Sequence, residues 1–177
     1  MSITAHYTEQ YVLKYYLPRL NFRWLIVGSA FPNFFLIDRI FMFLIDTKMH
    51  RDYLFGHFHT LIVPLACSLL IWWIFGRMPG LCFLIGSWLH VLTDIFDDIG
   101  VMLFWPLSNT KYSIGIWPWS DTSILYDWYR YFTTPASAIV EISFLVWAII
   151  VIRRSGTGTF WQKAIAPWKS SPWKEKR

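Results

Sequence analysis

Charge is scarce in this 177-residue chain, because Asp, Glu, Lys and Arg make up only 15% of it. An ordinary soluble domain carries about a quarter. Cysteine is also rare: Cys67 and Cys82 are the only two, and both lie in apolar runs. That setting favours packing thiols over a disulfide or a thiolate metal site. The chain is instead 55% hydrophobic and has 12 tryptophans. Such a composition indicates a membrane protein whose aromatic rings lie at the membrane interfaces.

Four apolar stretches approach the length of about 20 residues that a helix needs to cross a bilayer. They are residues 24–45, 61–75, 81–105 and 136–152. We therefore expect an all-α membrane protein, a four-span helical bundle with short interfacial helices. Residues 1–23 form an N-terminal segment that either lies on the membrane surface or packs as an arm, and a helix within it would end at Pro18. Residues 24–152 form the membrane-embedded domain, and residues 153–177 form a basic tail.

The basic residues predict how the chain is oriented. Most of the 16 lie before the first span, between the second and third spans, or after the fourth. Positive charge is enriched on the cytoplasmic side, so the chain is expected in the inner (plasma) membrane with several spans and both termini in the cytoplasm. Because the charge clusters at chain ends, it marks topology, and no nucleic acid is expected as a partner.

The most informative stretch is residues 86–106, GSWLHVLTDIFDDIGVMLFWP. Helical spacing places His90, Asp94 and Asp97 on one stripe, with Asp98 beside it. A carboxylate in an apolar helix usually faces the bundle interior and marks a site. His and Asp four residues apart can bind one metal ion. The alternative for Asp98 is a polar helix end that reaches water.

Other polar residues in or beside the spans belong to the same set. A loop at residues 46–60 contributes three histidines and an arginine, which raises the prospect of metal or phosphate binding. The first span carries an acidic residue after Pro32, and the fourth carries a lone glutamate that lipid contact would penalise. These residues are Asp38, His50, Arg51, His57, His59 and Glu141. In the expected topology one depth, in the half away from the cytoplasm, is shared by Asp38, His57, His59, Asp94, Asp97 and Glu141.

Three segments resemble a known family. Gly86 to Pro106 matches a glycine, His-x-x-x-Asp, Gly-Val and Trp-Pro. Residues 28–38, with Pro32 and Ile37-Asp38, fit a second motif only if a short insertion is allowed. Residues 50–60 fit a third, although the spacing leaves either His57 or His59 as the partner. The chain therefore resembles the bacterial and archaeal inner-membrane metal-dependent hydrolases of the LexA-regulated type. That family is distantly similar to zinc-dependent phospholipases C and related nucleases.

The resemblance implies a metal-dependent hydrolase that acts on a phosphodiester or a lipid headgroup at the outer side of the membrane. The expected cofactor is a divalent metal, zinc, bound by imidazole and carboxylate. Its expected ligands are Asp38, His59, His90 and Asp94, with His50, His57, Asp98 and Glu141 as further candidates. Asp97 is the expected base, or the partner that holds His90, and Arg51 would clamp a phosphate.

A non-enzymatic function is the alternative: a small transporter, an ion-conducting subunit or a membrane scaffold. The acidic residues inside the spans would then relay protons or bind a passing cation. Four short spans form a thin bundle, so such a protein would associate as a homo-oligomer. Membrane lipid is the expected neighbour in both cases. Metal content separates the two functions.

Overall fold

The chain is mostly helical in the part that the computed structural model describes, which is residues 3–33, 58–98, 100–116, 129–130 and 132–155. The elements are α1 (Ile3–Tyr16), α2 (Phe22–Ala30), the 3-10 turn η1 (Phe31–Asn33), α5 (Ile62–Phe75), α6 (Arg77–Thr93), the 3-10 turn η3 (Asp94–Phe96) and α8 (Pro135–Ser155). Within those residues no strand forms, although Val101 and Tyr112 form an isolated antiparallel β-bridge. The all-α prediction is confirmed for the described residues.

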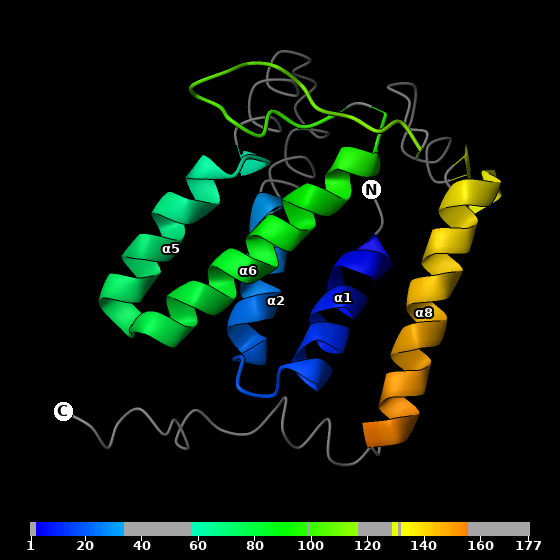
Figure 1. The fold of residues 1–177 in the computed structure, drawn as a ribbon, viewed down its shortest axis with the longest axis horizontal. Helices are drawn as coiled ribbons and strands as arrows, with labels where there is room; N and C mark the ends of the chain where they lie inside the picture. The colour runs from blue at the N-terminus through cyan, green and yellow to red at the C-terminus, as the bar shows by residue number, and fades with distance from the viewer. Residues whose placement is uncertain (1–2, 34–57, 99, 117–128, 131, 156–177) are drawn as a thin grey trace, which may run out of the picture.

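The helices lie side by side in the order α5, α6, α2, α1 and α8 (Figure 1). The main packing pairs are α2 with α6, α5 with α6, and α1 with α8. Figure 1 also shows that α1 begins at the end of the bundle where α6 ends and α5 and α8 begin. The opposite end holds the end of α1, the start of α2, the turn between α5 and α6, and the end of α8. Residues far apart in sequence are therefore brought to the same end.

Two of the helices pass the length and composition test for a membrane span. They are Arg77–Phe96, which is α6 with η3, and Pro135–Arg154 in α8. Helix α5 is apolar but has only 14 residues. Of the expected first span, residues 24–33 are described and belong to the nine-residue α2 and to η1, while residues 34–45 lie outside the described part. The described residues thus contain two candidate spans, whereas the sequence predicted four.

Glycine allows α2 and α6 to pack backbone against backbone. A Cβ added to Gly28 would overlap the carbonyl oxygen of Phe83, and one added to Gly86 would overlap the carbonyl oxygen of Leu25. Ser87 Oγ donates a 2.8 Å hydrogen bond to the carbonyl of Gly28 across the same contact. Small residues that let helices approach closely are typical of helix packing in membranes. This contact fixes α6, and with it His90, against α2.

Helix α1 packs against α2 and α8, as an N-terminal arm would. Tyr11 and Val12 are buried with Val151 of α8. The turn into α2 is fixed by Lys14, whose Nζ donates to the carbonyls of Pro18 and Leu20. Asn21 Oδ1 then caps α2 by accepting from the backbone N–H of Arg23. This packing brings the polar face of α1 into the bundle.

Helix α6 ends earlier than its sequence predicts. The apolar pattern continues to Trp105, but the α-helix stops at Thr93 and tightens into η3. Asp97 is extended, with φ −68° and ψ 150°. The predicted stripe that joins Asp97 to His90 and Asp94 is therefore wrong, because the helical repeat does not reach Asp97. The physical reason is that the backbone after Asp94 bonds to the following segment instead, where Ile95 O accepts from Ile114 N at 2.7 Å.

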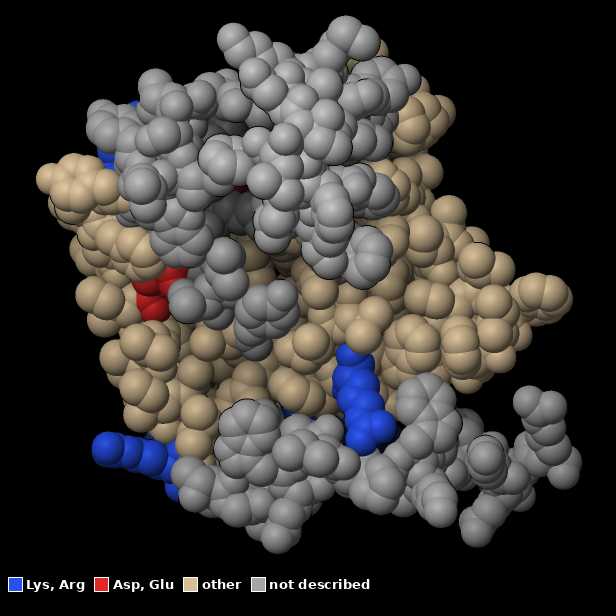
Figure 2. Space-filling view, turned by 180° about the vertical axis from the view of Figure 1, so that it is seen from behind, with Lys and Arg blue, Asp and Glu red and all other residues tan. Residues whose placement is uncertain are grey.

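The described surface in the view from behind is mostly uncharged (Figure 2). Most of the basic surface on this face lies at the lower end, away from the acidic patch. Large apolar side chains of α5 and α8 are exposed, among them Leu69, Trp73, Ile139 and Ile142. Exposed apolar faces of this extent are typical of helices that contact lipid or another apolar partner.

Candidate metal centre

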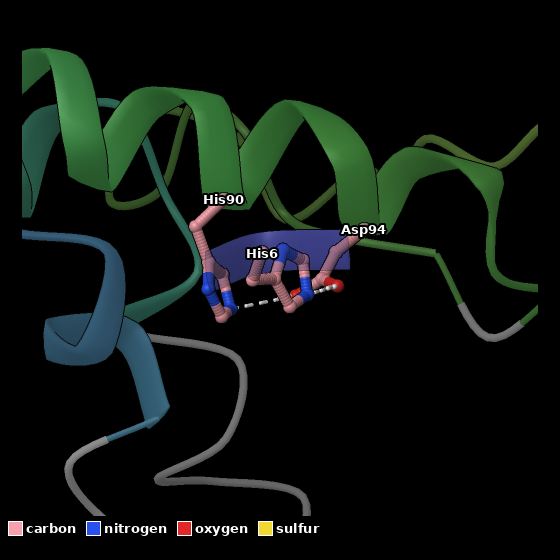
Figure 3. A group of neighbouring side chains, drawn as sticks. All are labelled: His6, His90 and Asp94. Atoms are coloured by element: carbon pink, nitrogen blue, oxygen red, sulfur yellow. Dashed lines mark ion pairs between the residues drawn. The ribbon is translucent and has the colours of Figure 1, made fainter. Parts of the chain in front are cut away.

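One buried carboxylate is surrounded by three imidazoles. Asp94 Oδ1 lies 3.2 Å from His6 Nε2, and Asp94 Oδ2 lies 3.2 Å from both His59 Nε2 and His90 Nε2. All four side chains are buried. The rings of His6 and His90 are stacked with their centroids 3.8 Å apart. In Figure 3, His90 and Asp94 extend from the end of α6 and its following turn, and His6 reaches them from α1.

The local structure explains how His59 and Asp94 reach this point. Thr60 Oγ1 accepts a hydrogen bond from the backbone N–H of Val63, which starts α5 and leaves His59 just before the helix. Leu61 N–H donates to the carbonyl of Leu103, and Trp88 Nε1 donates to the carbonyl of Leu61, which ties this segment to α6 and its following loop. Asp94 is the first residue of η3, one turn beyond His90. The start of α5 and the end of α6 are thereby held together.

His6, His90 and Asp94 have the arrangement of metal ligands. One donor atom from each lies within 4.8 Å of the others. The two Nε2 atoms and Asp94 Oδ1 are close together, yet none of the three makes a hydrogen bond of good geometry within the described residues. Buried polar atoms are normally hydrogen-bonded, and a missing ion is one of the explanations for an exception. The donor types also fit, because imidazole and carboxylate both bind divalent transition metals. This group could hold a metal ion.

A second layer of polar residues lies beside the three histidines. Thr93 Oγ1 is 3.0 Å from Glu9 Oε1 and 2.8 Å from the carbonyl oxygen of Leu89. Glu141 of α8 is buried, as predicted from the cost of exposing it to lipid, and its charge acts on Glu9. Burial raises the pKa of the Glu9 carboxyl above its ordinary value of 4.5. Gln10, one turn after His6, is fully buried, and neither its amide nitrogen nor its oxygen has a hydrogen-bond partner in the described part of the chain.

The structure brings together three of the residues predicted for the site: His59, His90 and Asp94. Asp97 is half-buried just beyond the candidate span, and burial raises its pKa to about 6. It does not hold His90, because His90 Nδ1 is buried without a hydrogen-bond partner in the described chain. Asp98 is exposed, as its polar-end alternative predicts. Four more predicted residues lie outside the described residues: Asp38, His50, Arg51 and His57.

Sequence reasoning missed His6. The N-terminal segment was interpreted for its aromatic and basic residues, which predict a surface helix or an arm. A signal was nevertheless present, because His6, Glu9 and Gln10 are spaced three and four residues apart and so share one face of a helix. A polar face with a histidine beside an apolar bundle points inward. The candidate metal site depends on this face, since α1 supplies one of its three possible ligands.

The helices and the site define a class: a helical membrane protein with a buried His-His-Asp group, whose candidate spans are α6 with η3 and α8. Comparison of the sequence with models of known protein families then identifies the family. The model of the YdjM inner membrane protein family matches residues 4–160, and the chain belongs to that family. Searches of the curated proteins and of the solved structures found no match. The matched range includes His6, His59, His90 and Asp94.

Proposed function

We propose that this protein is a metal-dependent hydrolase of the inner membrane, with His6, His90 and Asp94 as the ligands of one divalent ion. The carrying observation is the convergence of three imidazoles on one buried carboxylate, with His6 and His90 Nε2 making no hydrogen bond to it. Catalytic zinc sites use three protein ligands and keep one position open. Imidazole with carboxylate supports zinc as the metal. His59 Nε2 lies 3.2 Å from Asp94 Oδ2 and would help to hold this carboxylate in place.

A divalent ion at this site would supply Lewis-acid chemistry, which activates water and polarises a phosphoryl oxygen. Asp97 is the proposed base. Its pKa of about 6 leaves most of the carboxyl ionised at neutral pH, so it can accept a proton from water. Arg51 is still proposed as the phosphate clamp, from the sequence resemblance alone. The proposed substrate is a phosphodiester, either a lipid headgroup or a free diester.

We place the site at the outer side of the membrane. The end of the bundle opposite the site carries Lys14, Arg23, Arg77, Arg153 and Arg154, by the elements to which they belong (Figure 1). Positive charge favours the cytoplasmic side, which supports a cytoplasmic position for that end and for the tail after α8. Lipid is then the proposed neighbour of the exposed apolar faces of α5 and α8.

The proposed orientation differs at the N-terminus from the expectation that both termini are cytoplasmic. Helix α1 begins at the site end of the bundle and ends at the basic end (Figure 1). The charges that supported a cytoplasmic N-terminus, such as Lys14, belong to the last turn of α1 and to the residues after it. In the proposed orientation Ile3 therefore lies towards the outer side. A cytoplasmic N-terminus would require α1 to begin at the basic end of the bundle and to end at the site.

The test is metal-dependent hydrolysis by the purified protein in nanodiscs. Substrates are a short-chain phosphatidylcholine and bis(4-nitrophenyl) phosphate, which separate a lipid headgroup from a free diester. We expect activity that a chelator abolishes and zinc restores, and that His90→Ala and Asp94→Ala remove. Asp98→Asn is the matched control, because the structure places that carboxylate on the surface. Normal yield with no metal-dependent turnover of either substrate would refute the proposal, and ion flux in vesicles would then support the non-enzymatic alternative.

A further inference from the structure

Glu9 contacts Thr93, and this contact limits which of their oxygen atoms can carry a proton. The hydroxyl of Thr93 has two oxygen neighbours within hydrogen-bond distance: Glu9 Oε1 at 3.0 Å and the carbonyl oxygen of Leu89 at 2.8 Å. A threonine hydroxyl has one proton to donate. A carbonyl oxygen can only accept. If Thr93 donates to Leu89, the contact with Glu9 is a hydrogen bond only when the Glu9 carboxyl carries the proton.

The surroundings of Glu9 favour that arrangement. Donation from Thr93 to the carbonyl four residues earlier is a common use of threonine inside a helix. Glu9 Oε2 is buried and has no hydrogen-bond partner in the described chain. The charged groups acting on Glu9 are His6 on its own helix, Asp94 after α6 and Glu141 of α8, and no lysine or arginine of the described residues is among them. An ionised Glu9 would therefore face two other acids without a fixed positive partner.

We propose that Glu9 holds a proton in the resting protein and is the general acid of the hydrolysis. The inference rests on the function proposed above. In the step, the water oxygen forms a bond to phosphorus as the bond from phosphorus to the leaving oxygen breaks. The water gives its proton to Asp97, and the Glu9 carboxyl gives its proton to the leaving oxygen. The Glu9 carboxylate that results is stabilised when the Thr93 hydroxyl turns from Leu89 O to Glu9 Oε1, which the two distances allow.

The position of Glu9 fits this role. It lies one turn from His6 on α1 and contacts the residue that precedes Asp94. A general acid must be near the reacting atoms and must be protonated at the working pH. The contact with Thr93 gives Glu9 a fixed place, and burial beside two other acids favours its neutral form. Glutamine at position 9 can keep the same contact, since its amide group donates to Thr93 Oγ1, but it has no proton to transfer.

Infrared spectroscopy tests the resting proton without any turnover. A protonated carboxyl has a C=O stretch that a carboxylate lacks, so the parent at neutral pH should show this band and Glu9→Gln should lose it. Glu141→Gln is the matched control, because it replaces another buried carboxyl, on α8, and should leave the band in place. A band that disappears in Glu141→Gln and persists in Glu9→Gln would overturn the proposal.

Leaving-group dependence tests the catalytic role. An alkoxide leaving group needs a proton, whereas 4-nitrophenolate leaves without one. With unchanged zinc content, Glu9→Gln should lower kcat on the phosphatidylcholine by about 10²- to 10⁴-fold and change kcat on bis(4-nitrophenyl) phosphate by only a few fold. Equal losses on both substrates, or none on either, would overturn the role of Glu9 while leaving the hydrolase proposal intact. A parent inactive on both substrates would refute the hydrolase and the general acid together.

Discussion

The Asp94 carboxylate lies 3.2 Å from the imidazole of His6, a residue that is distant in the sequence and belongs to the first helix. The contact links the first helix to the turn that ends α6, and it completes a group that His90 and Asp94 alone cannot make. A metal ion there would join α1 to α6. Metal binding and the docking of α1 should therefore depend on each other.

Gln10 offers a test of burial within α1. Its amide is fully buried and has no partner in the described chain, and an unsatisfied buried polar group costs about 1–3 kcal/mol. We expect Gln10→Met to raise the Tm of the detergent-solubilised protein. Ser29→Ala is the control, because Ser29 Oγ donates to the His6 carbonyl and its loss should lower the Tm. A lower Tm for Gln10→Met would mean that the Gln10 amide has a hydrogen-bond partner in the folded protein.

The contact between α2 and α6 should not tolerate an added methyl group. A Cβ at Gly86 would overlap the carbonyl of Leu25, and overpacking of this kind costs about 1–3 kcal/mol. Gly86→Ala should therefore lower the Tm and the membrane-fraction yield. Ala66→Val adds bulk to an exposed position of α5 and should have little effect. Equal stability of the two variants would argue against close packing of α2 on α6.

Cysteine labelling tests the proposed orientation. Leu107 is 83% exposed in the loop that follows η3, at the site end, and Arg77 starts α6 at the opposite end. An impermeant thiol reagent should label Leu107→Cys in cells whose outer membrane has been permeabilised and whose inner membrane is intact. Arg77→Cys should react only after the inner membrane is permeabilised. The parent, with Cys67 and Cys82, gives the background. The reverse pattern would place the site on the cytoplasmic side.

The pH dependence of stability tests the environment of Glu9. Because burial raises its pKa above 4.5, the folded state holds the proton more tightly than the unfolded chain. The resulting stabilisation is fully present below pH 4.5 and is lost as the pH rises through the folded-state pKa. Glu9→Gln should therefore match the parent in Tm at acidic pH and exceed it at alkaline pH. Glu9→Asp, which still titrates, is the control. A difference in Tm that does not vary with pH would contradict the inferred burial.

Local spacing in the sequence was sufficient to predict part of this site. His90 and Asp94 are four residues apart in a helix, so their proximity follows from the helical repeat. His59 was singled out as a ligand candidate only through the family resemblance, which left His57 as an equal alternative. His6 could not be placed in this way, since its contact depends on how α1 packs against the bundle. Long-range packing of this kind leaves only a weak trace, in this case the polar face that His6 shares with Gln10.

Local sequence patterns also could not predict the residue at which α6 ends. The apolar run after Asp98 continues the hydrophobic pattern, which predicts a helix through Trp105. The chain instead turns at Gly100, with φ +73°, and Val101 pairs with Tyr112. A positive φ at glycine is common in turns, but the glycine alone does not reveal which segment it will pair with. Tertiary hydrogen bonds decided the boundary, and they moved Asp97 off the predicted stripe.

Metal content of the purified protein directly tests whether His6, His90 and Asp94 bind a divalent ion. The parent, His6→Ala and Gln10→Met should be prepared side by side from the membrane fraction, dialysed against zinc-free buffer and measured by mass spectrometry for divalent metals. Gln10→Met controls for a substitution on the same buried face of α1. We expect one divalent ion per chain in the parent and in Gln10→Met, and loss of most of it in His6→Ala at unchanged yield. No bound metal in the parent, or full metal occupancy in His6→Ala, would contradict it.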